Sequence, residues 1–201
     1  MATRERRTRE KVARRETILK AAKDIFVEKG LLASTIDEIA ARAEVAKGTI
    51  YLYFKSKEEI WAALLAEGLT LVTKRFTEAI DLALPADENL RRLCDAYCRV
   101  YREEPQYFKL LFLCSHADVR AKTCAAPSEC PGMPPLALLF QKGIDEGTFA
   151  PTVDPSQAAA IAWASSNGIV LMFEQNPDGL EALLKTNIEL LIRGLRATNP
   201  G

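Results

Sequence analysis

The sequence predicts an all-α fold, with three helices in a small N-terminal domain and six helices in a larger C-terminal domain. Apolar residues recur at helical spacing along most of the 201 residues, and strand-like alternation is scarce. Glycines, prolines and capping residues separate these stretches at intervals typical of helices. We place the boundary between the two domains between residues 55 and 56.

The N-terminal domain begins with a basic arm and an amphipathic helix. Residues 1–10 hold four arginines without an apolar stripe, which predicts a mobile arm. A helix follows from about Lys11, and Gly30 is expected to end it, because glycine tolerates the left-handed conformation of a helix C-terminus. The apolar face of this helix comprises Ile18, Leu19, Ala22, Ile25 and Phe26.

A second and a third helix follow, separated by a tight turn. Thr35 and Glu38 have the spacing of a capping box, which predicts the start of the second helix. The third helix covers about residues 47–53, and the apolar Ile50 and Phe54 are expected to point inward. Two short helices joined in this way are the pattern of a helix-turn-helix.

The C-terminal domain is predicted to contain six helices. A second capping box, Ser56 with Glu59, begins a long helix that we expect to reach about Leu84 and to link the two domains. Prolines and a glycine crowd residues 117–135, which predicts a long loop. The other five helices are expected at residues 90–104, 106–115, 136–146, 155–173 and 178–195.

The charges are unevenly distributed, although the whole chain is formally neutral. Residues 1–57 hold 14 Lys and Arg against 8 Asp and Glu, whereas residues 58–201 hold 13 against 19. A basic N-terminal domain favours contact with phosphate. The sequence has no apolar run long enough for a membrane span and no signal peptide, and its five cysteines are an odd number. We therefore expect a reduced, cytoplasmic protein.

Catalytic and metal-binding chemistry have little support. The chain has a single histidine and none of the common hydrolase, zinc-protease or P-loop motifs, so an enzyme is not expected. Cys94, Cys98, Cys114 and His116 could bind Zn²⁺. No CxxC pair occurs, however, and an isolated cysteine is commonly a small buried hydrophobe. We predict neither a metal nor a cofactor.

The outer face of the third helix has the chemistry of a DNA reader. Lys47 and Thr49 would reach base edges in the major groove, and Gly48 would allow a close approach. The resemblance to a known family is specific here: residues 14–60 are similar to the DNA-binding domain of the TetR family of one-component bacterial repressors. It is carried by residues 18–30, 35–40, 45–54 and 55–58.

The resemblance implies which side chains meet DNA. Phosphate contacts would come from Thr35, Tyr51, Tyr53 and Lys57, and groove contacts from Lys47, Gly48, Thr49 and Leu52. This chain departs from many relatives at two positions. Relatives often have an aromatic residue at the position of Leu52 and a histidine at the position of Tyr53. Two alternatives remain open, namely packing of the Tyr51 ring inside the domain, and minor-groove contact instead of a solvated arm for residues 4–11.

The resemblance also implies a homodimer and an effector cavity in the C-terminal domain. The last two helices are the expected dimer surface, through Ala158, Ala162, Ser165, Ser166, Ile169, Leu184, Ile188 and Leu191. The expected pocket is lined by Tyr97, Tyr101, Phe108, Phe112, Phe140 and Trp163, with His116 and Asn167 as its polar groups. For both sets the alternative is that the side chains only fill the core of the protomer.

The sequence therefore predicts a ligand-responsive transcriptional repressor. It would bind a near-palindromic operator as a homodimer, and a small, mostly apolar effector would release it. The effector would shift the long helix over residues 56–84 and change the separation of the two DNA-reading heads. The expected partners are double-stranded operator DNA, a second copy of the chain and the effector, without a membrane. The alternatives are a DNA-binding dimer without sequence specificity and, with less support, an all-α enzyme.

Overall fold

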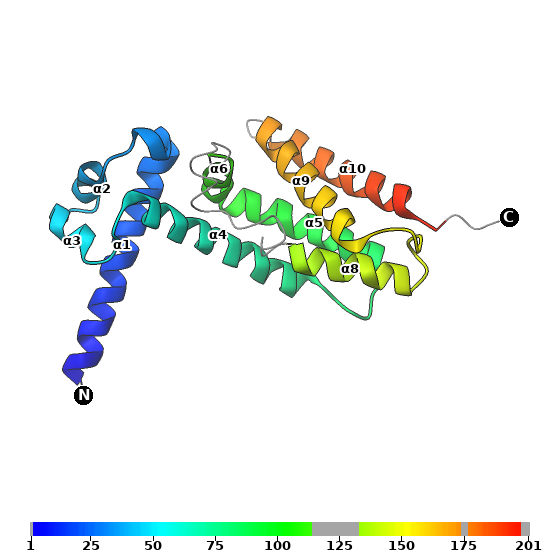
Figure 1. Ribbon diagram of the computed structural model, residues 1–201, viewed down its shortest axis with the longest axis horizontal. Helices are drawn as coiled ribbons and strands as arrows, with labels where there is room; N and C mark the ends of the chain where they lie inside the picture. The colour runs from blue at the N-terminus through cyan, green and yellow to red at the C-terminus, as the bar shows by residue number, and fades with distance from the viewer. Residues whose placement is uncertain (1, 114–132, 174–176, 198–201) are drawn as a thin grey trace. The chain divides into compact units, whose positions relative to one another are not determined.

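The computed structural model describes residues 2–113, 133–173 and 177–197 (Figure 1). Regular structure in these residues is helical, which confirms the predicted fold class. The helices are α1 (Ala2–Ala33), α2 (Ile36–Arg42), α3 (Lys47–Tyr51), α4 (Lys57–Ala79), α5 (Ala86–Glu103), α6 (Pro105–Leu113), α8 (Met133–Asp145), α9 (Pro155–Phe173) and α10 (Pro177–Leu195). No helix in these ranges is long and apolar enough to cross a bilayer.

The chain divides into two compact units. Unit 1 comprises the residues up to Gly68 together with α6 from Gln106 onward. Unit 2 begins at Leu69 and contains the rest of α4 together with α5, α8, α9 and α10. The division falls inside α4, whereas the sequence places the domain boundary at the start of this helix. Helix α4 therefore contributes residues to both units.

Helix α1 is longer than predicted. It begins at Ala2, so the segment predicted as an arm is helical. Arginine and glutamate are good helix formers, and Arg6 and Glu10 form an ion pair of 3.1 Å one turn apart. Gly30 interrupts the helix where expected, because its φ of 75° and ψ of 169° are not helical.

Helix α8 begins inside the segment that the sequence assigns to a loop. Its first residue is Met133, and Pro134 and Pro135 occupy the first turn. Proline is tolerated there because the first N–H groups of a helix have no partner within it. Residues 117–132, the rest of the predicted loop, lie outside the described part of the chain.

The core of unit 1 is a cluster of buried apolar side chains from α1 to α4. Phe26 of α1 and Trp61 of α4 are both fully buried, with ring centroids 5.1 Å apart in an edge-to-face arrangement. Helix α6 adds the fully buried Leu110 to the same cluster. The predicted inward residues Ile50 and Phe54 also belong to it. The short α2 and α3 are therefore held by a shared core rather than by their own helical stability.

A buried asparagine closes the turn between α4 and α5. The Asn89 side chain is completely buried. Its Oδ1 accepts a hydrogen bond of 2.8 Å from the backbone N–H of Asp81, and its Nδ2 donates to the carbonyl oxygens of Asp81 at 2.8 Å and of Leu84 at 3.1 Å. These bonds satisfy the irregular backbone after Ala79, and α4 consequently ends before the predicted Leu84.

Replacement of this asparagine should destabilise unit 2. We expect Asn89→Ala to lower the free energy of unfolding by about 2 kcal/mol, because the backbone groups of Asp81 and Leu84 lose a partner in partly buried hydrogen bonds. For a protein of this size the midpoint of thermal unfolding should fall by about 5 °C. Calorimetry of the full chain measures both values. The exposed Asp145, changed to Ala as a control, should leave the midpoint within about 1 °C. An Asn89→Ala midpoint equal to wild type would contradict this role.

Candidate functional site

The helix pair α2 and α3 is built by local hydrogen bonds that the sequence predicts. The Thr35 hydroxyl accepts a bond of 3.2 Å from the Glu38 N–H, and the Glu38 carboxylate accepts one of 3.0 Å from the Thr35 N–H. Both halves of the capping box are thus present. Glu44 forms the turn with φ 53°, a conformation that few side chains adopt, and Val45 donates to the Ala40 carbonyl at 3.0 Å.

The second capping box is formed in part. The Ser56 hydroxyl accepts a bond of 3.3 Å from the Glu59 N–H at the start of α4. The Glu59 carboxylate, however, accepts from the Lys55 N–H at 2.5 Å. The first turn of α4 is therefore fixed against the segment that follows α3.

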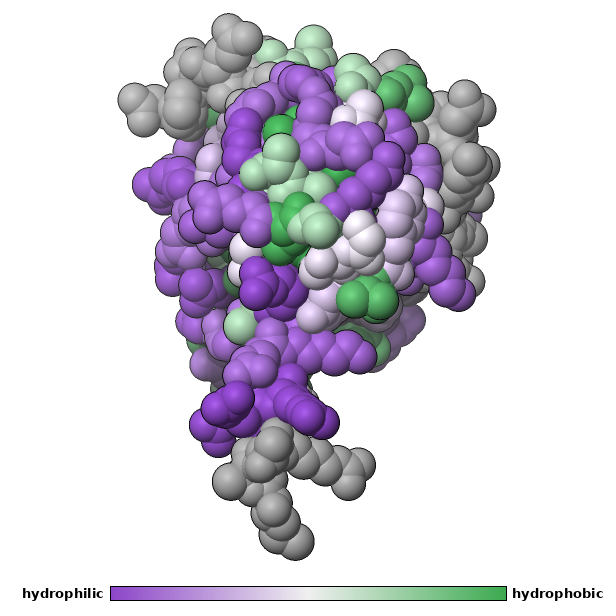
Figure 2. Space-filling model, turned by 90° about the vertical axis from the view of Figure 1, so that its left-hand side faces the viewer, coloured by the Kyte–Doolittle hydropathy of each residue, from purple (hydrophilic) through white to green (hydrophobic). Residues whose placement is uncertain are grey.

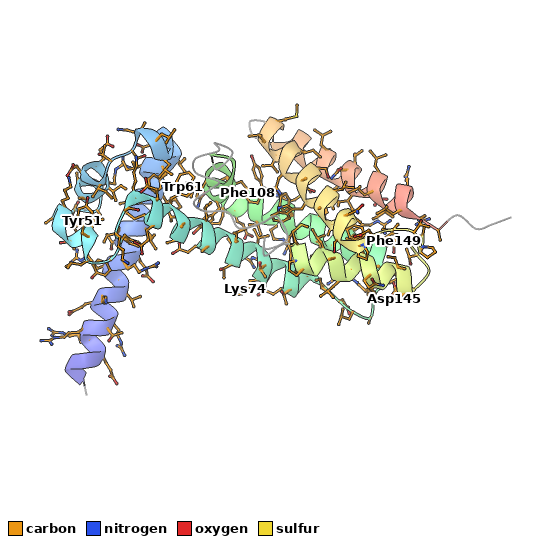
Figure 3. The ribbon with its side chains drawn as sticks, in the orientation of Figure 1. Tyr51, Trp61, Lys74, Phe108, Asp145 and Phe149 are labelled. Carbon is orange, nitrogen blue, oxygen red and sulfur yellow. The ribbon has the colours of Figure 1, made fainter. Side chains whose placement is uncertain are left out.

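The outer face of α3 is accessible. Lys47 and Gly48 are exposed, Tyr51 is 49% exposed and Leu52 is 78% exposed. Figure 3 shows Tyr51 at the outer edge of this unit, apart from the core residue Trp61. The alternative that the Tyr51 ring fills the core is therefore wrong. Figure 2, which looks at this side of the molecule, shows mostly hydrophilic side chains with small apolar patches between them.

The remaining predicted DNA contacts flank this face. Thr35 is exposed at the start of α2, whereas Thr49 and Tyr53 are partly buried. The Lys47 ammonium lies 2.9 Å from Asp37 Oδ2, and this hydrogen bond raises the pKa of Lys47. Both side chains are more than half exposed, so the pair exchanges partners at little cost when another anion approaches.

Lys57 is placed differently from the other predicted contacts. Its ammonium donates to the carbonyl oxygens of Leu31 at 2.8 Å, Leu32 at 3.1 Å and Ser34 at 2.8 Å. An ammonium has three protons, so these three acceptors use all of them. Lys57 therefore ties α4 to the end of α1, and a phosphate would have to displace one of these carbonyls. The neighbouring Lys55 is exposed.

Unit 2 contains a small apolar cavity of about 30 Å³. Of the predicted pocket residues, Tyr97 and Trp163 line it. The Tyr97 hydroxyl donates to Asn167 Oδ1 at 2.9 Å, and Asn167 Nδ2 donates to the Trp163 carbonyl at 2.8 Å. Sequence reasoning missed most of the lining, which is Phe76, Leu90, Leu93, Cys94, Leu136, Ala162, Ser166, Leu184 and Ile188. Apart from Ser166, these residues are ordinary apolar positions of amphipathic helices, so the sequence carries no signal that selects them.

Other predicted pocket residues lie away from this cavity. Phe140 packs against Phe149 with centroids 5.7 Å apart, which makes it part of the unit 2 core. Tyr101 is buried without lining the cavity, and Phe108 is a buried residue of unit 1. The Phe112 side chain and the whole of His116 lie outside the described residues.

The predicted dimer surface needs correction. Ala158, Ala162, Leu184 and Ile188 are between 1% and 7% exposed within a single protomer, so they belong to its core and cannot face a second copy. Ser165, Ser166, Ile169 and Leu191 are partly buried. The large apolar side chains that α9 and α10 leave exposed are Ile161 (56%), Leu171 (51%), Met172 (78%), Leu183 (37%) and Leu190 (63%).

Two cysteines on α5 are neighbours. Cys94 and Cys98 are buried one turn apart. The hydrogen bond between the two thiols raises the pKa of Cys94 and lowers that of Cys98. The described residues contain no group of three or more side chains suited to a metal ion. Cys114, the third member of the set considered from the sequence, lies in the segment that is not described.

Comparison with known proteins agrees with this geometry. The family "Bacterial regulatory proteins, tetR family" matches residues 18–64, which include α2 and α3. The chain is 38% identical over 81 residues to the uncharacterized HTH-type transcriptional regulator YhgD of Bacillus subtilis, covering 40% of this chain and 42% of that protein. It is 31% identical over 99 residues to the HTH-type transcriptional activator FasR of Mycolicibacterium smegmatis, covering 49% and 45%. These matches thus span less than half the length of these relatives.

Solved structures are similar over nearly the whole chain. The fatty acid degradation regulator FadR of Bacillus halodurans aligns with a TM-score of 0.78 at 24% identity, over 92% of this chain and 97% of that one. The transcriptional regulator FadR of Bacillus subtilis, solved in complex with stearoyl-CoA, aligns with a TM-score of 0.75 at 27% identity, over 90% and 99%. The likeness therefore extends beyond the helix-turn-helix to the helices that follow it.

Proposed function

This chain belongs to the TetR family of bacterial regulatory proteins, and we propose that it is a ligand-responsive transcriptional repressor that binds a near-palindromic operator as a homodimer. The single observation that carries this proposal is the accessible outer face of α3. Lys47, Tyr51 and Leu52 project from a short helix that the protein's own core does not cover. Leu52 in particular is a large apolar side chain in water, and contact with a thymine methyl group would give it a partner.

The homodimer is proposed to form through α9 and α10. Their exposed apolar side chains would meet the same side chains of a second copy across a two-fold axis. Two helices from each protomer would then form a four-helix bundle. A two-fold arrangement of the reading helices matches the symmetry of a palindromic operator.

The effector is proposed to bind in unit 2, at the cavity between the aromatic side chains. Phe76, Tyr97 and Trp163 form a cluster with centroids 6.3 to 6.4 Å apart, and the Tyr97–Asn167 pair supplies polar atoms beside it. A cavity of about 30 Å³ holds no more than one or two waters, so a ligand must favour a more open conformation of these helices. The stearoyl-CoA complex of a similar structure makes fatty acyl compounds the first class to test.

Release from DNA is proposed to follow from a displacement of α4, since this helix contributes residues to both units. Binding of the effector in unit 2 would favour a different position of α4. The α3 helices of the two protomers would then be separated by a different distance. Heads that no longer fit successive major grooves lose affinity, and such coupling is typically about 1–3 kcal/mol. The effector and the operator would therefore weaken each other's binding by the same factor.

A footprint on the intergenic DNA upstream of the gene tests the repressor proposal. The full chain should protect one near-palindromic site, and an acyl-CoA series should abolish the protection. Competition with random duplex separates a repressor from a DNA-binding dimer without sequence specificity, because the operator should be preferred by about a thousandfold or more. Protection without sequence preference would favour the second function, and no protection at any site would overturn both.

Substitution of the reading face should weaken operator binding without unfolding the protein. We expect Lys47→Ala to reduce operator affinity by about tenfold to a hundredfold, because a base-edge or phosphate contact is lost. The change also leaves Asp37 without its partner, so the double variant Lys47→Ala/Asp37→Asn separates lost contact from added repulsion. Lys74→Ala on α4 is the control, since Lys74 is exposed in unit 2. Equal binding by the Lys47 and Lys74 variants would remove Lys47 from the interface.

A further inference from the structure

The side chains in the first turns of α1 are exposed. Every side chain from Glu5 to Thr17 is exposed, and the buried positions of this helix begin at Ile18. In Figure 1 this part of α1 extends past α2 and α3 without another helix of unit 1 beside it. A solvated helix of this length gains little stability by itself, and packing within unit 1 adds little to it.

Three cations on this exposed part of α1 share one face. At 100° per residue, Arg7, Lys11 and Arg14 fall on one side, which is also the side that Ile18 continues into the core. No carboxylate pairs with these three cations among the described residues. Glu5 and Glu16 fall on the opposite side. The third acidic residue, Glu10, is held by Arg6 at 3.1 Å.

The neighbouring Arg15 shows what this turn of α1 contacts within unit 1. Its guanidinium lies 5.1 Å from the centre of the Phe54 ring and 3.9 Å from Glu67. Phe54 directly follows the α3 segment that carries Tyr51 and Tyr53. Arg15 therefore places this turn of α1 beside the segment that follows α3, and the row runs from Arg14 toward the start of α1.

We propose that Arg7, Lys11 and Arg14 form a second DNA-contact surface, the α1 cationic row, which binds the phosphate backbone that flanks the bases read by α3. The inference rests on the proposed function, because it requires that α3 places unit 1 on DNA. The row spans about 10 Å along the helix, and a duplex presents one negative charge per about 1.7 Å of its axis, so each cation has a phosphate within reach. Contacts of this kind add affinity and fix register, without adding sequence information.

The test compares two double variants that lose the same two charges from the same short segment. Arg7→Gln/Arg14→Gln removes cations from the row, whereas Arg6→Gln/Arg9→Gln removes them from the other sides of the helix. The full-length protein is titrated with the footprinted duplex and with a random-sequence duplex over a series of salt concentrations. We expect the row variant to flatten the plot of log affinity against log salt by about two per protomer, and to bind about tenfold or more weakly at physiological salt.

The control variant should keep the wild-type slope, and helix content by circular dichroism should be equal in both variants. Shortening the duplex to the bases that α3 covers should make the row variant and the wild type bind equally. Equal losses in the two variants would mean that only net charge matters, and would overturn the inference. Unchanged DNA binding in the row variant would overturn the inference as well. This holds also if binding of the row variant to phosphatidylglycerol vesicles, measured in parallel, is lost. If the wild type binds neither duplex, the proposed function falls together with this inference.

Discussion

Leu190→Glu is expected to convert the homodimer into monomers. Leu190 is 63% exposed on α10, in line with Leu183 at 37%, and α9 also carries the exposed Ile161 and Leu171. In a two-fold interface the substitution buries two carboxylates and removes two apolar contacts. Each protomer therefore contributes the same loss of association free energy. Central apolar positions of interfaces often contribute about 2 kcal/mol or more each. The dissociation constant of the dimer should therefore rise by about a thousandfold.

Sedimentation and light scattering over a range of protein concentrations measure this change directly. Leu82→Glu is a matched control, because Leu82 is 75% exposed in the turn after α4 and belongs to neither α9 nor α10. Operator affinity should fall by about a hundredfold or more in the Leu190 variant, since two linked heads bind one duplex far better than separate ones. Thermal stability of the monomer distinguishes this effect from unfolding. A Leu190→Glu protein that stays dimeric would show that this surface is not the interface.

The error in the predicted dimer surface has a physical cause. Helices α9 and α10 each carry apolar residues on two sides, and the periodicity of a sequence does not tell which side faces the protomer's own helices. The small Ala158 and Ala162 and the large Leu184 and Ile188 lie on the inner side. Substitution of Leu184 by Ala should consequently cost about 2–5 kcal/mol of folding free energy, instead of changing the oligomeric state alone.

The helix-turn-helix was predictable because its signals are local. Thr35 and Glu38 bond to each other within one turn, and Ile50 and Phe54 fall on the inner face of one short segment. The cavity in unit 2 was predictable only in part. Tyr97 and Trp163 could be selected as aromatic residues, whereas the other lining residues are brought together by packing of distant helices, which no local pattern encodes.

Lys57 shows the same limit for a charged residue. A lysine at the start of a helix beside a DNA-reading segment suggests a phosphate contact. The carbonyl groups of Leu31, Leu32 and Ser34 that it binds are 23 to 26 positions earlier in the chain. Because the backbone leaves the helical conformation at Gly30, no helical N–H donates to these carbonyls. The Lys57 ammonium donates to them instead.

Lys57→Met should therefore destabilise unit 1 strongly. Methionine keeps the aliphatic part of the side chain, so the change isolates the ammonium. Hydrogen bonds to a charged group contribute about 1.5–3 kcal/mol, and three carbonyls lose theirs, two of them in partly buried bonds, so we expect a loss of about 3 kcal/mol in the free energy of unfolding. For this chain length the midpoint of thermal unfolding should fall by about 8 °C.

Lys55→Met provides the matched control, because the exposed Lys55 side chain lies only two residues away. It should leave the midpoint within about 1 °C, so that equal midpoints for the two variants would contradict the role of the Lys57 ammonium. Salt titration of operator binding, carried out below the unfolding range of both variants, then tests the phosphate contact that the family resemblance implies for Lys57. A slope flatter by about one for Lys57→Met would mean that the ammonium exchanges a carbonyl for a phosphate on DNA, and a wild-type slope would assign Lys57 to the fold alone.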